Sequence, residues 1–150
     1  MKTDFTIRQA QQSDAVALKE LFQNTVLVIN RRDYSQAEVE DWASCGNNLS
    51  NIKERIETHY FVVAVNQQSQ IVGFSSIATM LLEEIERYAI TAGITRITSE
   101  VSLTARPFFE KKGYVVEKEQ KRKANQLSLT NFLMAKEVAF LEYYNKKVTD

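Results

Sequence analysis

The chain has 150 residues, of which 44% are hydrophobic and 25% are charged, and its 19 basic residues balance its 19 acidic ones. This length and composition are typical of one globular domain that folds without a metal ion or a disulfide. Zero net charge gives no electrostatic reason to expect a nucleic acid or an anionic membrane as a partner.

The compartment is suggested by the cysteine content and by the N-terminus. Cys45 is the one cysteine, so no intramolecular disulfide can form, and this fits a reducing cytoplasm. The first residues lack the apolar stretch of a signal peptide, and no apolar run is long enough to cross a bilayer. We therefore expect a cytoplasmic protein with no membrane partner.

The N-terminal third is predicted to hold a strand followed by helices. Apolar and polar residues alternate around Phe5 and Ile7, which indicates a strand. Ser13 is predicted as the N-cap of the first helix. Ser35 and Glu38 have the spacing of a capping box, which predicts the start of a short helix that carries Trp42.

The middle of the chain is predicted to form a β-hairpin followed by a helix. The apolar run Tyr60 to Val65 indicates a buried strand, and a second strand is predicted from Ile71 to Ile77. Apolar residues then recur at helical spacing from about Ala78, and Gly93 stands where the residue after a helix is often glycine.

The C-terminal third is predicted to alternate between strands and short helices. A short helix is expected to end at Gly113, and the tail 138–150 is expected to add a further helix. The predicted strands are Ile94 to Val101, Tyr114 to about Lys121, and Leu127 to Met134. This order of elements predicts one mixed α/β (α+β) domain over residues 1–150.

Several segments, taken in this order, resemble the GCN5-related N-acetyltransferase (GNAT) superfamily, most closely its small bacterial YafP-like branch. The segments are Ile7-Arg8 with Ser13-Asp14, Asp33-Tyr34-Ser35 with Trp42, Ile71-Val72-Gly73-Phe74, Ile77 to Leu82, and Ser102 to Tyr114. The resemblance covers most of residues 5–135, and the order and spacing of the segments make it fairly specific.

The resemblance implies a fold, a cofactor and a substrate class. The fold would be a mixed twisted sheet flanked by helices, the cofactor acetyl-CoA, and the acceptor a primary amine on a small molecule or peptide. The resemblance implies cofactor contacts at Ile77, Ala78, Thr79, Ser102, Arg106 and Phe109, and acceptor contacts at Tyr34, Ser35 and Trp42. The alternative for the acceptor group is a capped helix with a buried tryptophan.

The sequence departs from the family pattern at two places. The central strand and the glycine-rich loop that binds the CoA pyrophosphate are not present, since Gly73 is the only glycine near the start of the main helix. Acetyl-CoA binding is therefore expected to be weak or absent. Phe109 occupies the place of a tyrosine that protonates the leaving thiolate in many members, and phenylalanine has no proton to donate.

The other candidate residues have ordinary structural explanations. Glu83, Glu84 and Glu86 are interpreted as acids early in a helix that complement its dipole. His59 is interpreted as a structural or surface histidine. A single histidine gives no basis for a metal site or a Ser-His-Asp triad, and no catalytic residue is assigned.

The missing strand also predicts a rearranged centre of the sheet. We expect Ile71 to Ile77 to take its place, parallel to Ile94 to Val101, through a right-handed crossover. The alternative is that a second chain fills the position and forms a homodimer.

Two functions therefore remain open. The first is an acetyl-CoA-dependent N-acetyltransferase that is impaired by the loss of the cofactor loop. The second is a non-catalytic GNAT-like domain that binds a ligand or a protein.

Overall fold

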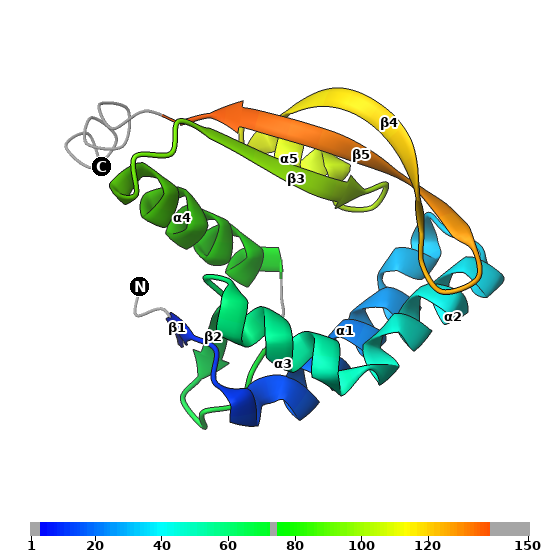
Figure 1. Cartoon of the computed structure of the whole chain (residues 1–150), viewed down its shortest axis with the longest axis horizontal. Helices are drawn as coiled ribbons and strands as arrows, with labels where there is room; N and C mark the ends of the chain where they lie inside the picture. The colour runs from blue at the N-terminus through cyan, green and yellow to red at the C-terminus, as the bar shows by residue number, and fades with distance from the viewer. Residues whose placement is uncertain (1–3, 73–74, 139–150) are drawn as a thin grey trace. The chain divides into compact units, whose positions relative to one another are not determined.

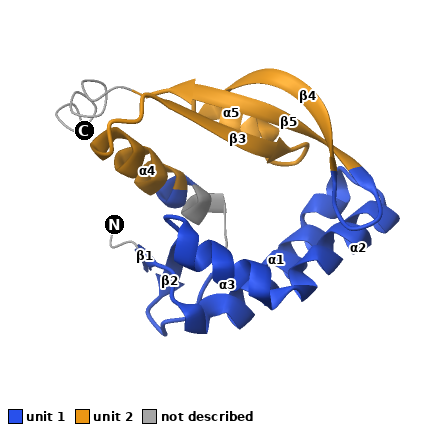
Figure 2. Cartoon of the chain, in the orientation of Figure 1, with its two compact units in different colours: residues 1–81, 123–128 blue, residues 82–122, 129–150 orange. Residues whose placement is uncertain are grey.

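The computed structural model describes residues 4–72 and 75–138, without the side chains of residues 75–78. The chain divides into two compact units, which Figure 2 shows in different colours. Unit 1 comprises residues 1–81 and 123–128, and unit 2 comprises residues 82–122 and 129–150.

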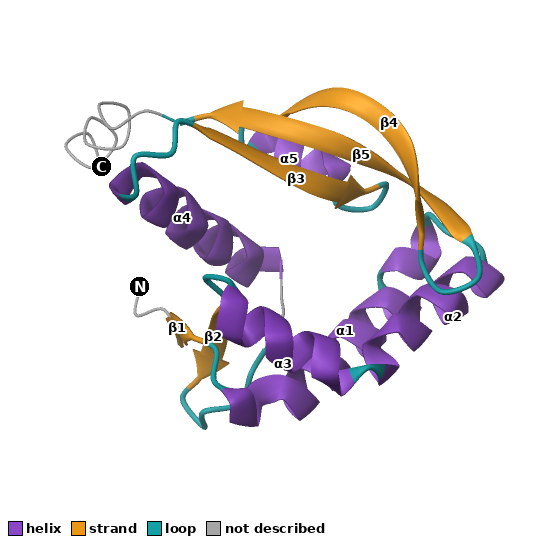
Figure 3. Ribbon diagram, viewed as in Figure 1, coloured by secondary structure: helices purple, strands orange, loops and turns teal. Residues whose placement is uncertain are grey.

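Helices and strands alternate along the chain in the order that the sequence predicted for most of its length (Figures 1 and 3). The strands are β1 (Phe5–Gln9), β2 (Val62–Asn66), β3 (Arg96–Ser102), β4 (Val115–Lys123) and β5 (Ser128–Glu137). The α-helices are α1 (Ala15–Val28), α2 (Gln36–Ser44), α3 (Leu49–Thr58), α4 (Ser75–Thr91) and α5 (Arg106–Lys111). This mixed architecture confirms the predicted α/β (α+β) class.

Unit 1 joins a two-stranded sheet to three helices. β1 and β2 pair antiparallel, with Phe5 opposite Asn66 and Gln9 opposite Val62. α1 lies against both α2 and α3. Its apolar interior comes from the helices and β2, and consists of Ala15, Val26, Val39, Ala43, Val63, Ala64 and Val65. The predicted first strand is confirmed.

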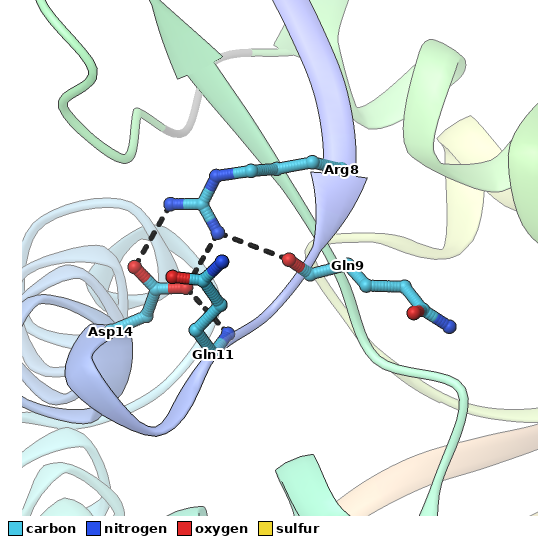
Figure 4. Close-up of polar contacts among 4 residues, drawn as sticks. All are labelled: Arg8, Gln9, Gln11 and Asp14. Carbon is cyan, nitrogen blue, oxygen red and sulfur yellow. Dashed lines mark hydrogen bonds and ion pairs between the residues drawn. The ribbon is translucent and has the colours of Figure 1, made fainter.

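The start of α1 differs from the sequence prediction. Ser13 lies inside a short 3₁₀ turn, Gln12–Asp14, and α1 begins at Ala15. The Asp14 carboxylate accepts the backbone N–H of Gln11 at 2.7 Å and forms an ion pair with Arg8 through both guanidinium Nη atoms (Figure 4). The prediction of Ser13 as N-cap was wrong because the ionised carboxylate next to it is the stronger acceptor.

The start of α2 agrees with the prediction. The Ser35 hydroxyl accepts the backbone N–H of Glu38 at 3.2 Å, and the Glu38 carboxylate accepts the backbone N–H of Ser35 at 2.8 Å. The capping box is therefore confirmed in both of its hydrogen bonds.

The predicted second strand of the hairpin, Ile71 to Ile77, is wrong from Ser75 onward, and its residues 73–74 lie outside the described part of the structure. Ile71 forms an isolated bridge with Val65, and the N–H of Val72 donates to the carbonyl of Ala64. From Ser75 onward the backbone is helical. Residues 75–77 are the first turn of α4, where their carbonyl groups accept N–H groups of the following turn instead of pairing with a neighbouring strand.

Unit 2 is built on a three-stranded sheet in the order β3-β5-β4. β3 and β5 pair antiparallel, with Arg96 opposite Glu137 and Ser102 opposite Asn131. β4 and β5 form a hairpin in which the N–H of Ala124 donates to the carbonyl of Leu127. Val101, Tyr114, Phe132 and Met134 make the buried core of this unit, and Leu82 of α4 and Phe109 of α5 pack against it.

The predicted parallel pairing of Ile71 to Ile77 with Ile94 to Val101 was wrong. Among the residues that the structure describes, β3 pairs with β5 and no other strand, and residues 75–77 are helical. The centre of the expected GNAT-like sheet is therefore shortened, because within the described ranges no further strand lies between Ile71 and α4. Completion of the sheet by a second chain stays a prediction.

Both predicted helix-ending glycines are confirmed. Gly93 has φ +76° after α4 and Gly113 has φ +87° after α5, in the left-handed region that favours glycine. The predicted helical tail 138–150 lies outside the described residues after position 138. The prediction of a single domain over residues 1–150 stays a prediction.

Candidate functional site

The residues predicted to contact the acceptor lie together in unit 1. Tyr34 is 7% exposed, and its ring centroid lies 5.5 Å from that of Trp42 in an edge-to-face arrangement. Phe22 of α1 also lies edge-to-face with Trp42, with its ring centroid 6.5 Å from that of Trp42. The three rings form an aromatic cluster between α1 and α2.

The role of Ser35 beside this cluster is visible in its hydrogen bonds. Its hydroxyl oxygen accepts a backbone N–H of α2, and its own backbone N–H is bound by Glu38. These contacts fix the start of α2 and thereby the position of Trp42, about two turns later. Ser35 thus acts on the aromatic cluster indirectly, because it caps the helix that carries Trp42.

The cofactor residues predicted at the start of the main helix lie within α4. The helix begins at Ser75, so Thr79 is its fifth residue, and its N–H falls within the intrahelical ladder. The expectation of a helix start near Ala78 and Thr79 was therefore wrong by three residues. The side chains of Ile77 and Ala78 lie outside the described part of the structure.

The remaining predicted cofactor residues, Ser102, Arg106 and Phe109, lie close together in unit 2 between the end of β3 and α5. The Ser102 hydroxyl accepts the N–H of Ala105 at 3.1 Å. The guanidinium of Arg106 lies 4.5 Å from the ring centroid of Phe132, and its Nε donates to Glu110 at 2.7 Å. Arg106 therefore already has a carboxylate partner and an aromatic one.

Phe109 belongs to the apolar interior of unit 2. Its ring centroid lies 5.1 Å from that of Tyr114 and 5.6 Å from that of Phe108, both edge-to-face. Phe109 is partly buried and packs against the buried cluster of Val101, Tyr114, Phe132 and Met134.

Unit 2 also holds buried polar atoms that lack a hydrogen-bond partner. They are Thr104 Oγ1, Gln120 Nε2 and Asn131 Oδ1. Asn131 stands opposite Ser102 in the register of β3 and β5, and Thr104 lies two residues after Ser102. A buried acceptor without a hydrogen-bond donor is energetically costly.

A polar cluster that the sequence did not predict lies between α4 and the sheet of unit 2. Lys136 Nζ donates to both carboxylate oxygens of Glu86 at 3.0 and 3.2 Å, and the Tyr114 hydroxyl donates to Glu86 at 3.2 Å. The lysine Nζ also lies 5.6 Å from the Tyr114 ring centroid. The cluster ties α4 to β5 and to Tyr114, the residue before β4.

This cluster corrects the interpretation of Glu86. Because α4 runs from Ser75 to Thr91, Glu86 lies in the middle of the helix and not in its first turn. Its side chain is 16% exposed, so it is a partly buried ion-pair partner and does not complement the helix dipole. The spacing of Leu82, Ile85 and Ala89 on the inner face could have revealed that Glu86 borders that face.

The Tyr114 phenol is unsuited to proton transfer near neutral pH. Burial raises its pKa above the usual value, and the negative charge of Glu86 and the hydrogen bond to it raise the pKa further. A tyrosine that holds its proton this strongly is a poor general acid.

Among the residues that the structure describes, no helix is long and apolar enough to cross a membrane. Within the same residues, no group of three histidine, cysteine, aspartate or glutamate side chains could hold a metal ion. His59 is exposed, and its Nδ1 is hydrogen-bonded to the Thr58 hydroxyl oxygen at 2.8 Å.

Comparison of the sequence with known proteins supports the family resemblance. The chain matches no protein-family model. It is 27% identical over 143 residues to the uncharacterized N-acetyltransferase YafP of Escherichia coli, which covers 85% of this chain and 93% of the relative. The alignment is 143 residues long but covers 85% of the 150 residues of this chain. Part of the aligned relative therefore has no counterpart in this chain.

Solved structures with the same fold include two that match most of both chains. A GCN5-related N-acetyltransferase from Rhodopseudomonas palustris has a TM-score of 0.86 at 22% identity, covering 92% of this chain and 98% of the other. The PaiA N-acetyltransferase from Thermoplasma acidophilum, solved in complex with coenzyme A, has a TM-score of 0.70 at 18% identity and covers 90% and 99%. The resemblance drawn from the motifs is confirmed: the chain is similar in sequence to an N-acetyltransferase and shares the fold of solved GNAT structures.

Proposed function

We propose that this protein is an acetyl-CoA-dependent N-acetyltransferase that acts on a primary amine of a small molecule or peptide, with weakened cofactor binding. The observation that carries the proposal is the likeness to an N-acetyltransferase fold over 92% of the chain at a TM-score of 0.86. The relative at 27% identity, itself named an N-acetyltransferase, gives independent support from sequence.

The aromatic cluster of unit 1 is the proposed acceptor site. An alkylammonium group is attracted to the faces of Trp and Tyr rings, and Tyr34 and Trp42 stand edge-to-face at 5.5 Å. Ser35 contributes by fixing the start of α2, which carries Trp42. The amine must lose its proton before it can attack a thioester carbonyl, and no residue is assigned as the base for this step.

The residues present fit only part of an acetyl-CoA molecule. Acetyl-CoA supplies a thioester whose acyl group is transferred to the amine. In unit 2, Ser102 and Arg106 are proposed cofactor contacts, and the unpartnered Asn131 Oδ1 next to Ser102 would accept an amide N–H of the pantetheine arm. Phe109 is proposed to contribute apolar contact alone.

The pyrophosphate part of the cofactor is not matched. Ile71 and Val72 bridge to β2 and α4 starts at Ser75, so no glycine-rich loop precedes the helix. An exposed helix N-terminus typically contributes about 0.3–1 kcal/mol to holding an anion, whereas micromolar affinity needs about 8 kcal/mol. We therefore expect acetyl-CoA to bind weakly or not at all.

The missing loop also favours a second candidate function. A non-catalytic GNAT-like domain would use the same aromatic cluster to bind an amine ligand or a protein segment without acyl transfer. It needs no pyrophosphate site, which is the part of the family pattern that this chain lacks.

Calorimetric titration with acetyl-CoA, together with a thiol-release assay against a panel of primary amines, separates the two functions. The enzyme proposal predicts slow CoA release that requires both an amine and acetyl-CoA. No binding of acetyl-CoA and no amine-dependent release, even at millimolar concentrations, would overturn it in favour of the binding domain. A dissociation constant of about 1 µM or lower would instead refute the argument from the missing loop.

The acceptor site has its own test. Trp42→Ala removes the central ring of the cluster and should raise the KM for the amine, or its dissociation constant if the protein is only a binder. His59→Ala is the matched control, since His59 is exposed and lies outside the cluster. Equal amine affinity in the two variants would exclude Trp42 from the acceptor site.

A further inference from the structure

Within unit 2 taken by itself, one long edge of the sheet has no strand paired to it among the described residues. β3 is the outer strand in the order β3-β5-β4, and among the described residues it pairs with β5 alone. An open strand edge presents N–H and C=O groups that can pair with another chain. The sequence of this strand and its pairing register decide what can bind there.

The hydrogen bonds of β3 determine which residues face the open edge. The carbonyl of Thr95 accepts the N–H of Val138 at 2.8 Å, so this pair, which continues the β3–β5 register, is a hydrogen-bonded one. Hydrogen-bonded and non-hydrogen-bonded pairs alternate along an antiparallel ladder. The backbone groups of Arg96, Thr98 and Glu100 therefore point away from β5.

The side chains of these same three residues lie on one face of the sheet, since they occupy alternate positions. All three are exposed, whereas Val101 on the other face is buried in the core. The edge therefore presents a positive charge at Arg96, a small polar residue at Thr98 and a negative charge at Glu100.

We propose that the open edge of β3 binds β3 of a second copy of this chain, antiparallel, with Thr98 opposite Thr98 of that copy. In this register every edge-facing residue meets another edge-facing residue, so their N–H and C=O groups can form hydrogen-bonded pairs. Arg96 then stands opposite Glu100 of the second copy, and Glu100 stands opposite Arg96 of the second copy. The arrangement has the twofold symmetry of a closed dimer.

Charge complementarity is the argument for this occupant. Opposite charges directly across a strand pair stabilise it, and like charges destabilise it. A parallel arrangement in register would place each arginine against an arginine, so the sequence favours the antiparallel one. Arg96 already contacts Glu117 and Glu137, and Glu100 contacts Arg122, so each charge keeps a partner when the copies separate.

The expected association is weak. A single added strand buries less surface than the roughly 1,200–2,000 Å² of stable protein interfaces. The dimer should therefore form at high protein concentration, and added salt should weaken it because the two ion pairs are exposed to solvent. This inference does not depend on acetyl-transfer activity.

Sedimentation velocity on the full chain, from about 10 µM to about 1 mM, covers the range in which such an interface associates. Thr98→Pro removes the edge-facing N–H while leaving the hydrogen bonds between β3 and β5 in place. Thr98→Val is the matched control, because it also loses the hydroxyl but keeps the N–H. The proposal predicts that the proline variant dimerises at least about tenfold more weakly than the valine variant.

Amide hydrogen exchange on the unmodified chain gives a second test that needs no variant. The N–H groups of Arg96, Thr98 and Glu100 should gain protection as the concentration rises. The N–H groups of Ile97 and Ser99, which face β5, should be protected at every concentration. A chain that stays monomeric throughout, a dimer that Thr98→Pro does not weaken, or protection gained elsewhere than at these three amides would overturn the proposal.

Discussion

Replacement of Asp14 by asparagine tests the ion pair that fixes the start of α1. The Asp14 carboxylate receives two N–H groups of Arg8, at 2.7 and 2.9 Å, and the backbone N–H of Gln11 at 2.7 Å (Figure 4). The asparagine side chain keeps the shape of the carboxylate but loses its charge and can accept through one oxygen alone. The variant therefore isolates the charge of the pair.

The magnitude follows from the exposure of the two side chains. Breaking a fully buried ion pair costs about 3–5 kcal/mol, and a hydrogen bond to a charged group contributes about 1.5–3 kcal/mol. The Asp14 side chain is 11% exposed, but that of Arg8 is 35% exposed and can be rehydrated when its partner is lost. We expect the variant to lower the free energy of unfolding by about 2 kcal/mol.

The assay is urea unfolding followed by tryptophan fluorescence. Trp42 is the single tryptophan, and it lies in the same unit as Arg8 and Asp14. Asp33→Asn is the matched control, because Asp33 pairs with Arg32 at 3.3 Å and the arginine side chain is 70% exposed. The control should change stability by less than about 0.5 kcal/mol.

The difference between the parent protein and Asp14→Asn should depend on pH. The hydrogen bond from Arg8 lowers the pKa of Asp14 below its usual value, against the opposing effect of burial, and the Gln11 N–H lowers it further. A carboxylate with a lowered folded-state pKa stabilises the protein above the unfolded-state pKa of about 3.9. That stability is lost as the pH falls through the folded-state value.

We therefore expect the full difference at pH 7 and a shrinking difference in acid below about pH 4. A variant as stable as the parent at pH 7 would refute the assigned role of the ion pair. A destabilisation that stays constant into acid would show that the loss comes from packing and not from charge.

Three further predictions concern single contacts or backbone positions. The Asp41 carboxylate accepts the backbone N–H groups of residues 125–127 at 2.9–3.0 Å, so Asp41→Asn should speed amide hydrogen exchange at these residues. Unchanged exchange there would contradict the anchoring of the β4–β5 turn by Asp41. Met134→Ala should cost about 2–5 kcal/mol in thermal or urea unfolding because Met134 is fully buried, whereas Val115→Ala, at a 67% exposed position, should cost less than about 0.5 kcal/mol. Gly93→Ala should cost about 1–2 kcal/mol by circular dichroism melting because φ is +76° while nothing lies near the added methyl, so a neutral result would mean that the left-handed turn is not maintained.

Local chemistry allowed the sequence to determine most elements of this protein. The capping box of Ser35 and Glu38 and the glycines that end α4 and α5 depend on neighbouring residues alone, and all are confirmed. The order of strands and helices also follows from hydrophobic periodicity. The family resemblance followed from the order and spacing of short motifs, and it is confirmed as well.

The tertiary structure decided what depends on residues far apart in the chain. Residues 75–77 were predicted to end a strand but are helical, because a strand needs a neighbouring strand to complete its hydrogen bonds. Glu86 became an ion-pair partner of Lys136, 50 positions later, and this pairing is not encoded in either residue's neighbours. The direction in which the backbone groups of β3 point was likewise set by its register with β5, and that register defines the edge proposed to bind a second copy.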